Sequence, residues 1–338
     1  MPIHASTPSP SQGLTPPLTV VVPMAQPNMR LELSRATNPQ RLRGRRLQDS
    51  LSSPGRATQP RVSLRQEWRR RVNLRHVNRL AWDRQVDLEN PWTIPVGQET
   101  IAKARSGEWH IVLTPTRPVP REWLGDVAGQ KILCLASGGG QQGPVLAAAG
   151  AIVTVFDNSP RQLQQDRMVA QREGLQIETV EGTMTDLSVF VGEAFDTIVH
   201  PVSNCFIDDV LPVWREAARV LKLGGALLAG FNNPIVYAFD PALMESAGQL
   251  SVTHALPYSD LQVLERGEID KRLQRGVPLE FSHTLQTLIG GQMVAGLVMT
   301  GLYEDHDRPG ENVAINRYFS PYIATRSVKP KHCAGYHV

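Results

Sequence analysis

The sequence has little cysteine and no long apolar segment. Three of its 338 residues are cysteines, Cys134, Cys205 and Cys333, and they stand far apart. This spacing argues against a disulfide framework and against a metal cluster, and it predicts a chain of the reducing cytoplasm that holds no metal. No apolar run approaches the ~20 residues that cross a bilayer. The run from Leu18 to Val22 is too short for the core of a signal peptide and has no basic region before it.

Lysine is absent from the first 75 residues, which contain 13 arginines and only three acidic residues. The formal net charge of the whole chain is only +3, so the remainder is mildly acidic. Residues 1–62 are rich in proline, serine, threonine and arginine, which predicts a disordered basic tail. Its arginine cluster at 41–46 suits a solvated tail, or an arm for nucleic acid or a membrane surface. Aromatic residues do not alternate with the arginines, so nucleic acid is the less favoured partner.

What the chain does have is a glycine-rich stretch at residues 131–143. A short apolar run, 132–136, ends in Ser137 and three adjacent glycines at 138–140. An apolar run bounded by glycine predicts a buried strand that breaks into a tight turn. Adjacent glycines permit positive φ values and have no Cβ, so a ligand can lie against the backbone. With a short helix predicted over 144–149, the stretch is typical of a nucleotide site at the carboxyl edge of an α/β sheet.

Strands and helices alternate after this stretch. Ser159, Pro160 and Gln162 form the capping box of a helix that should end at Gly174. A second helix is predicted over 210–221 and should end at the glycine pair that follows it. Four more apolar runs predict strands, at 152–156, 175–180, 195–200 and 226–231. Repeated units of this length predict an α/β fold, a Rossmann-like doubly wound sheet with parallel strands.

The C-terminal third breaks this pattern. Residues 241–280 mix short strand-like pieces with charged turns, and 285–300 predicts a helix. Strands predicted at 302–305 and 322–328 would add an antiparallel C-terminal hairpin to the mostly parallel sheet. We therefore expect a domain over 125–330 with a substrate-side insertion at about 241–300.

The segment before the sheet, 63–124, has many aromatic residues and few breaks. Helices are predicted over 63–86 and 97–106. Such a segment should pack on the ligand-binding edge of the sheet as a helical lid. Together with the insertion at 241–300 it would form the pocket for a substrate. The side chains predicted to line that pocket are Trp92, Trp109, Tyr258 and His283.

Five short segments carry a family resemblance. They are ILCLASGGG at 132–140, VFDNS at 155–159, GTMTD at 182–186, FDTIV at 195–199 and RVLKLGG at 219–225. Their joint order resembles the class I S-adenosylmethionine-dependent methyltransferases, of the small-molecule type 11 kind, over residues 125–235. The resemblance implies transfer of a methyl group from S-adenosylmethionine to a small-molecule acceptor by in-line displacement.

The same resemblance implies a set of site residues. The glycine turn would receive the methionyl end of the cofactor, Asp157 the ribose, and the segment around Met184 the adenine, with Asp186 near its amine. His200 would face the reactive methyl group and is the candidate general base. Each also has a structural alternative: Asp157 as a helix cap, Met184 as core filling, and His200 as a buried structural histidine. The implied cofactor-binding residues are Ser137, Gly138, Gly139, Gly140, Asp157, Asn158, Thr183, Met184, Asp186, Pro201 and Asn204.

The sequence departs from the family pattern in three places. Cys134 stands where an acid is common, so the cofactor ammonium would rely on backbone carbonyls or on an acid from 63–124, unless Cys134 is simply a core residue. Thr183 also stands where the family more often has an acid. After the fourth strand the chain reads His-Pro-Val-Ser at 200–203, not the Asn/Asp-Pro-Pro-aromatic run of enzymes that methylate base amines. This argues against DNA or RNA as the acceptor.

Two other functions stay open at the level of sequence. Gly138, Gly140 and Gly143 match the G-x-G-x-x-G turn of NAD(P)-dependent oxidoreductases, and Asp157 follows roughly 20 residues later. The short helix after the turn, the methyltransferase-like run at 219–225, and the lack of a hydride-transfer set after residue 240 count against it. The third possibility is a non-catalytic protein that binds S-adenosylmethionine.

Overall fold

The computed structural model describes residues 72–308 and 313–331. The predicted basic tail and residues 63–71 lie outside this range. The described residues belong to one unit of the chain, Arg61–Val338. Among them, no helix is both long and apolar enough to cross a membrane.

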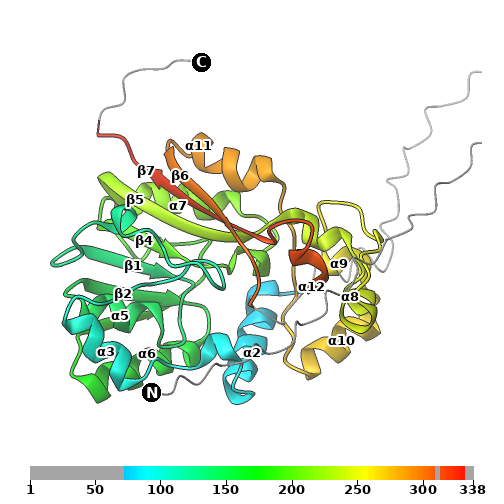
Figure 1. Ribbon diagram of the computed structural model, residues 1–338, viewed down its shortest axis with the longest axis horizontal. Coiled ribbons are helices and arrows are strands. Elements are labelled where there is room, and N and C mark those ends of the chain that lie inside the picture. The colour runs from blue at the N-terminus through cyan, green and yellow to red at the C-terminus, as the bar shows by residue number, and fades with distance from the viewer. Residues whose placement is uncertain (1–71, 309–312, 332–338) are drawn as a thin grey trace, which may run out of the picture. The chain divides into compact units, whose positions relative to one another are not determined.

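A seven-stranded sheet forms the centre of this unit, in the order β3-β2-β1-β4-β5-β7-β6 (Figure 1). Strands β1 to β5 are parallel, while β7 lies antiparallel between β5 and β6. The predicted Rossmann-like sheet with an antiparallel C-terminal hairpin is therefore confirmed. The strands are β1 (Lys131–Leu135), β2 (Ile152–Asp157), β3 (Ile177–Glu181), β4 (Phe195–His200), β5 (Leu221–Asn232), β6 (Val298–Asp305) and β7 (Tyr322–Val328).

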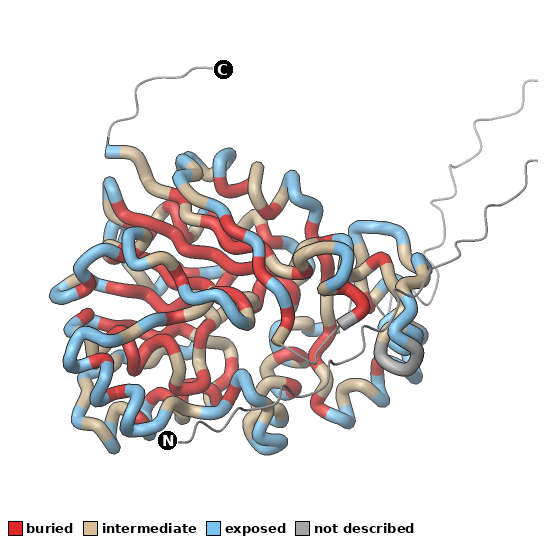
Figure 2. Tube along the Cα trace, viewed as in Figure 1, coloured by how far each residue is buried: buried red, intermediate tan, exposed pale blue. Residues whose placement is uncertain are grey.

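Both faces of the sheet are buried, because alternate side chains of each strand point to opposite faces. Leu133 and Leu135 of β1 pack in one core with Trp214, whereas Ile132 and Cys134 pack in the other. Buried residues accordingly follow the strands in Figure 2. This double burial explains why the strands read as continuous apolar runs in the sequence.

Helices cover the two faces in the way that right-handed crossovers require. On one face lie α3 (Gln98–Arg105), α5 (Gln142–Ala148) and α6 (Pro160–Glu173), and on the other α7 (Leu211–Val220) and α11 (Gly291–Val294) (Figure 1). The Ser159 cap of α6 is confirmed, since its hydroxyl accepts from the Gln162 N–H at 3.1 Å, but the reciprocal bond of a capping box is not formed, because the Ser159 N–H donates to Asp157 Oδ1. The remaining helices are α2 (Leu74–Asp87), α4 (Arg121–Leu124), α8 (Pro241–Ala247), α9 (Asp260–Val263), α10 (Arg266–Gln274), α12 (Val313–Asn316), and the short turns η1 (Pro91–Thr93), η2 (Asn204–Phe206), η3 (Pro234–Ala238) and η4 (Gln286–Gly290).

The prediction for 241–280 was wrong, because α8, α9 and α10 lie there in place of strand-like pieces. The helix start was visible in the sequence: Asp240 caps α8 by accepting from the Ala242 and Leu243 N–H groups, with Pro241 at the first helical position. The charged turns concealed this signal, since these short helices lack a strong apolar period.

Two further boundaries were wrong. The helix predicted over 285–300 ends at Val294, because Gly296 turns the chain at φ 89° and β6 then pairs with β7. The helix predicted to end at Gly224 ends at Val220 instead, and the glycine pair lies inside β5. In both cases strand pairing across the sheet overrides the local pattern.

Candidate active site

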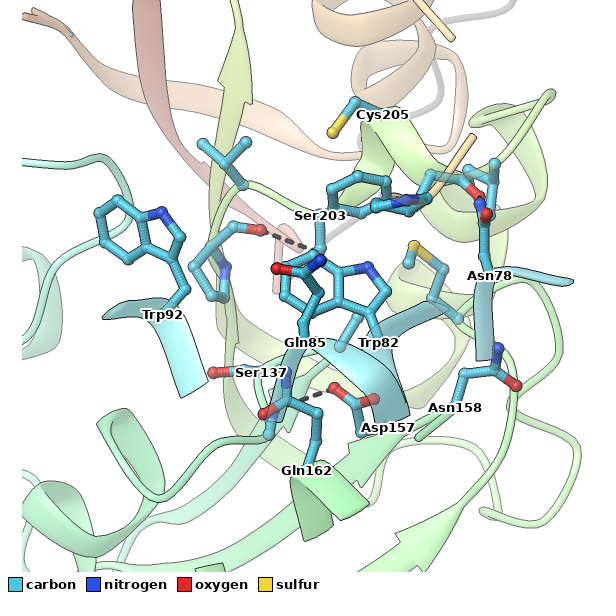
Figure 3. Close-up of a pocket in the computed structure, with 18 of the residues that line it drawn as sticks. Asn78, Trp82, Gln85, Trp92, Ser137, Asp157, Asn158, Gln162, Ser203 and Cys205 are labelled. Carbon is cyan, nitrogen blue, oxygen red and sulfur yellow. Dashed lines mark hydrogen bonds between the residues drawn. The ribbon is translucent and has the colours of Figure 1, made fainter. Parts of the chain in front are cut away.

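A cavity of about 650 Å³ opens at the carboxyl ends of β1, β2 and β4 (Figure 3). One end, called the cofactor end below, is formed by the turn after β1, the end of β2 and the loop after β3. The other, called the acceptor end, is formed by α2, by the segment around η2 and by residues 277–280. The residues of the cofactor end are Ser137, Gly138, Asp157, Asn158, Gln162, Gly182, Thr183 and Met184.

Asp157 closes β2 and turns its carboxylate toward the glycine turn. Its Oδ2 atom accepts from the Gly138 N–H at 2.9 Å, and its Oδ1 atom accepts from the Ser159 N–H at 2.9 Å. Burial raises the pKa of this carboxyl, while the backbone hydrogen bonds oppose the shift. Each oxygen keeps a second lone pair, so the group can accept from a ligand diol at the cavity wall. Asp157 thus lies at the cavity wall, where it was predicted to meet a ligand. It also accepts from the backbone at the start of α6, as the structural alternative predicted.

Two buried acceptors at the cofactor end have no protein partner. Ser137 Oγ and Gln162 Oε1 are buried and make no hydrogen bond, although both residues line the cavity. Buried polar atoms in a native structure are rarely left without a partner, so a ligand donor is expected here. A Cβ on Gly138 would lie 2.7 Å from the Gln162 Cβ, so the turn needs glycine there to keep this geometry.

Gly139 and Gly140, two of the predicted cofactor-binding residues, do not line the cavity. Their N–H groups both donate to Asp166 Oδ2, at 3.0 and 3.1 Å, so they are not free to bind a ligand. Asp166 lies on α6 and is fully buried. Asp166 thus places an acid below the glycine turn. It is neither a backbone carbonyl nor an acid of segment 63–124, the two groups that were expected to compensate for Cys134. Cys134 itself is a buried residue of the core.

Burial raises the pKa of Asp166 to about 7, and it also raises the pKa of the neighbouring Cys134 thiol. Gly143 packs into the same place: a Cβ there would lie 2.7 Å from Val155 Cγ2 and 3.2 Å from Asp166 Oδ1. A pyrophosphate would need the N–H groups that Asp166 already occupies. The G-x-G-x-x-G alternative is therefore not supported by the geometry.

Only part of the segment that was predicted to contact the adenine lies at the cavity. Thr183 and Met184 line the cavity. Asp186 does not: its side chain is exposed and accepts from the Ser188 N–H at 3.0 Å, and the bonds to Ser188 lower the pKa of its carboxyl. Asn158 lines the cavity and is tied to α2, since its Nδ2 donates to the Arg75 carbonyl at 2.8 Å.

The segment after β4 contains the predicted general base, His200, and two predicted cofactor-binding residues, Pro201 and Asn204. Pro201 lines the cavity, but His200 and Asn204 do not. The His200 ring is fully buried with Nδ1 hydrogen-bonded to the Leu135 carbonyl at 2.9 Å, and burial lowers its pKa to about 4. Asn204 is buried as well and donates to the Gly230 carbonyl at 3.0 Å. His200 and Asn204 thus hold strands together, and this geometry does not support His200 as a general base.

The buried side-chain amide of Asn78 connects three segments of the acceptor end. Asn78 of α2 donates to the Phe206 and Leu279 carbonyls at 2.8 and 3.0 Å, and its Oδ1 accepts from the Leu279 N–H at 2.8 Å. Trp82, one turn further along α2, meets the Phe206 ring edge-on at 5.1 Å between centroids. Figure 3 shows the Cys205 side chain away from the Asp157 carboxylate, with the Trp82 ring drawn between the two. Cys205 also lines this end.

Of the four side chains predicted for the acceptor pocket, only Trp92 lines the cavity. Trp109 lies under the Arg121 guanidinium at 3.6 Å, and His283 donates to the Asn204 carbonyl at 2.9 Å. Tyr258 lines a neighbouring cavity instead. The residues that the sequence analysis missed are Asn78, Trp82, Gln85, Cys205, Phe206 and Glu280. Three of them recur at helical spacing on one face of α2, a signal that was present in the sequence.

No group of three or more histidine, cysteine, aspartate or glutamate side chains is placed to hold a metal within residues 72–308 and 313–331.

Comparisons with known proteins agree with this geometry. A family model described as a methyltransferase domain matches residues 133–229. The chain is 52% identical over 252 residues, 75% of its length and 97% of the relative, to a protein named "Uncharacterized methyltransferase YbaJ" from Bacillus subtilis (strain 168). It is 28% identical over 130 residues, 38% of its length and 54% of the relative, to a ubiquinone biosynthesis O-methyltransferase of Xanthomonas euvesicatoria pv. vesicatoria (strain 85-10).

Among solved structures, an S-adenosylmethionine-dependent methyltransferase from Mesorhizobium loti matches with a TM-score of 0.48 at 16% identity, over 62% of this chain and 94% of that one. The extent and identity of the match to the Bacillus subtilis protein, together with the domain match over β1 to β5, establish the family. The chain belongs to the class I S-adenosylmethionine-dependent methyltransferases.

Proposed function

We propose that this chain binds S-adenosylmethionine at the cofactor end of the cavity and methylates a small-molecule acceptor held at the acceptor end. One observation carries the proposal: a single cavity joins Gly138 and Asp157 at the cofactor end to Trp82 at the acceptor end. Methyl transfer requires donor and acceptor to share one enclosed space, because in-line displacement brings the two reacting atoms into direct contact.

The residues of the cofactor end fit the methyl donor. When bound, S-adenosylmethionine supplies a methyl group on a positively charged sulfur, which is a good leaving group. Ser137 Oγ and Gln162 Oε1 would accept from its ammonium, and Asp157 from its ribose hydroxyls. Thr183 and Met184 would lie beside its adenine. None of these groups needs to exchange a proton, so this end serves to hold and orient the donor.

The acceptor end favours a small organic molecule. Its walls include the rings of Trp82, Phe206 and Tyr322, which offer apolar contact area with few polar groups. Helix α2 covers this pocket and is fastened at both ends of the cavity, by Asn78 to Leu279 and by Asp83 to Ser159. We propose that α2, as part of the predicted lid 63–124, excludes water from the transfer, which together with alignment can contribute ~7–11 kcal/mol.

Calorimetric titration tests the cofactor assignment. The wild-type chain should bind S-adenosylmethionine and give no heat with NAD. Asp157→Ala removes two charge-assisted hydrogen bonds to the ribose, so the affinity should fall by about 3 kcal/mol, on the order of 100-fold. Asp186→Ala is the matched control, because Asp186 is exposed outside the cavity, and its affinity should match the wild type. Equal affinities for Asp157→Ala and wild type would refute the ribose assignment.

A labelled-methyl assay tests turnover. Radiolabelled S-adenosylmethionine is incubated with a small-molecule extract of bacterial cells and either the wild type or Gly139→Arg. Gly139 has φ 112°, and its Cβ would meet the Trp92 carbonyl at 2.9 Å, so the arginine should disrupt the turn. Label in a small molecule with the wild type alone supports the proposal. Tight binding of S-adenosylmethionine without any labelled product would favour the non-catalytic alternative.

A further inference from the structure

Glu280 lies where the main cavity meets a second cavity of about 330 Å³. It lines both, as do Asn232 and Tyr322. Two hydrogen bonds fix its main chain: its N–H donates to Asp260 Oδ2 at 2.8 Å, and its carbonyl accepts from the Asp260 N–H at 3.0 Å. The side chain therefore projects from a rigid point on the cavity wall, which is what a reacting group requires.

A hydrogen-bond relay orients the carboxylate of Glu280. Asn232 Nδ2 donates to the Tyr237 hydroxyl at 2.8 Å, and that hydroxyl donates to Glu280 Oε2 at 3.0 Å. Asn232 can only donate from this nitrogen, so the tyrosine proton points away from it, toward the side where Glu280 Oε2 and the Cys205 thiol both bond to Tyr237. Within the described residues no donor is hydrogen-bonded to Oε1 of Glu280. One oxygen is thus held by the protein, and the other is left for a ligand.

The charge on Glu280 is not neutralised by an ion pair within residues 72–308 and 313–331. The charge of Arg272 acts on Glu280 and lowers the pKa of its carboxyl, but the Arg272 guanidinium is itself paired with Asp260 at 3.1 Å. Burial is the largest influence on Glu280 and raises the pKa of its carboxyl, which brings a carboxylate toward the range where a general base works well at neutral pH. The titratable and charged groups around Glu280 are Tyr237, Tyr258, Tyr322, Cys205, Asp260 and Arg272.

We propose, resting on the proposed function, that Glu280 is the general base for an acceptor whose nucleophile is a hydroxyl or N–H group. As the acceptor oxygen or nitrogen bonds to the methyl carbon, the carbon–sulfur electron pair leaves with sulfur and the acceptor proton passes to Glu280 Oε1. Tyr237 is a positioning residue that holds Oε2 and favours the charged form of the carboxylate. His200, which is sealed in the core, takes no part.

Rates of labelled-methyl transfer to the small-molecule extract, measured against pH at saturating S-adenosylmethionine, test this role. Glu280→Gln should lower the rate by about 100-fold or more and abolish the acidic limb of the profile, with S-adenosylmethionine affinity within twofold of the wild type. Tyr237→Phe should move the acidic limb to higher pH, because the hydroxyl bond that lowers the pKa of Glu280 is lost. Glu268→Gln, an exposed position on α10, is the matched control and should behave as wild type.

Difference infrared spectroscopy of the carboxyl C=O band gives a readout that needs neither acceptor nor cofactor. The full-length wild type should show several carboxyls that titrate above the ordinary range, Asp166 among them, and Glu280→Gln should lose one of these while that of Asp166 remains. Transfer by Glu280→Gln at the wild-type rate, or an unshifted acidic limb in Tyr237→Phe, overturns the role of Glu280. A wild-type chain that binds no S-adenosylmethionine instead overturns the proposed function, so the two failures are distinct.

Discussion

The two ends of the cavity are built from opposite kinds of sequence. The cofactor end consists of short contiguous segments, 137–138, 157–158 and 182–184, each directly after a strand of the parallel sheet. The acceptor end joins segments that are distant in the chain, with Asn78 bound to Leu279 across 201 positions. The comparison separates a donor site fixed by local turns from a substrate site that exists only after the chain has folded.

Besides Asp157, burial raises the pKa of one more carboxyl near each end, Asp166 under the glycine turn and Glu280 at the acceptor end, and access to the cavity separates these two. Asp166 lies beneath the glycine turn, where its Oδ2 accepts two N–H groups, and it does not line the cavity. Glu280 lines the cavity and receives one hydroxyl donor on Oε2. A pKa raised by burial is therefore shared by a structural carboxyl under the turn, Asp166, and by the proposed general base at the acceptor end, Glu280.

The largest effect is expected for Asp166→Asn, measured as the free energy of unfolding in urea against pH. Burial raises the pKa of Asp166 to about 7 in the folded chain, against ~3.9 when unfolded. The folded state then binds the extra proton between these values, so the contribution of Asp166 to stability falls as pH rises. From pH 5 to 8 the wild type should lose roughly 3 kcal/mol relative to the variant. A pH-independent difference would contradict the buried-acid role.

The fold and the cofactor end were largely predictable from the sequence, because their signals are local. Apolar runs ending in Gly138 or Asp157 specify a strand and its turn within a few residues. Asp166 was missed because its role depends on α6 packing under the turn, 26 positions from Gly140. His200 has the right position in sequence, but the sequence carries no information on which way its ring turns, and the core encloses it.

The acceptor end was mostly unpredictable, because the contacts that form it join segments far apart in the sequence. Glu280 is one of many acids in a charged segment, and only the pairing of its backbone with Asp260 brings it to the cavity. The helical spacing of Asn78, Trp82 and Gln85 predicts a polar and aromatic helix face, but not what that face covers. Long-range packing supplies that information.

A change at Asn78 should break the acceptor end while leaving the cofactor end intact. Asn78→Ala removes two buried hydrogen bonds to Leu279 and a partly buried one to Phe206. Each buried bond contributes about 1 kcal/mol, so unfolding should become easier by about 2 kcal/mol. The affinity for S-adenosylmethionine should change less than twofold. Leu80→Ala, an exposed site on the same helix, should alter stability by less than about 0.5 kcal/mol. A large loss of cofactor affinity in Asn78→Ala would show that the two ends are coupled.

The smallest effect is expected for Gly138→Ala, which perturbs the cofactor end alone. The added Cβ would lie 2.7 Å from Gln162 Cβ and 3.2 Å from Asp157 Oδ2. The Cβ of Gln162 is fixed by the backbone, so the turn or the start of α6 must shift. This shift moves the proposed acceptor of the ammonium, so calorimetry should show S-adenosylmethionine binding about tenfold weaker, or 1.4 kcal/mol. Gly267→Ala on α10 is the control, since no atom lies within 4 Å of its added Cβ and alanine favours a helix. Because neither glycine has a positive φ, a loss confined to Gly138→Ala would come from the close packing of the turn rather than from backbone strain. Unchanged affinity would mean that Gln162 does not contact the cofactor, and the orphaned acceptor would need another partner.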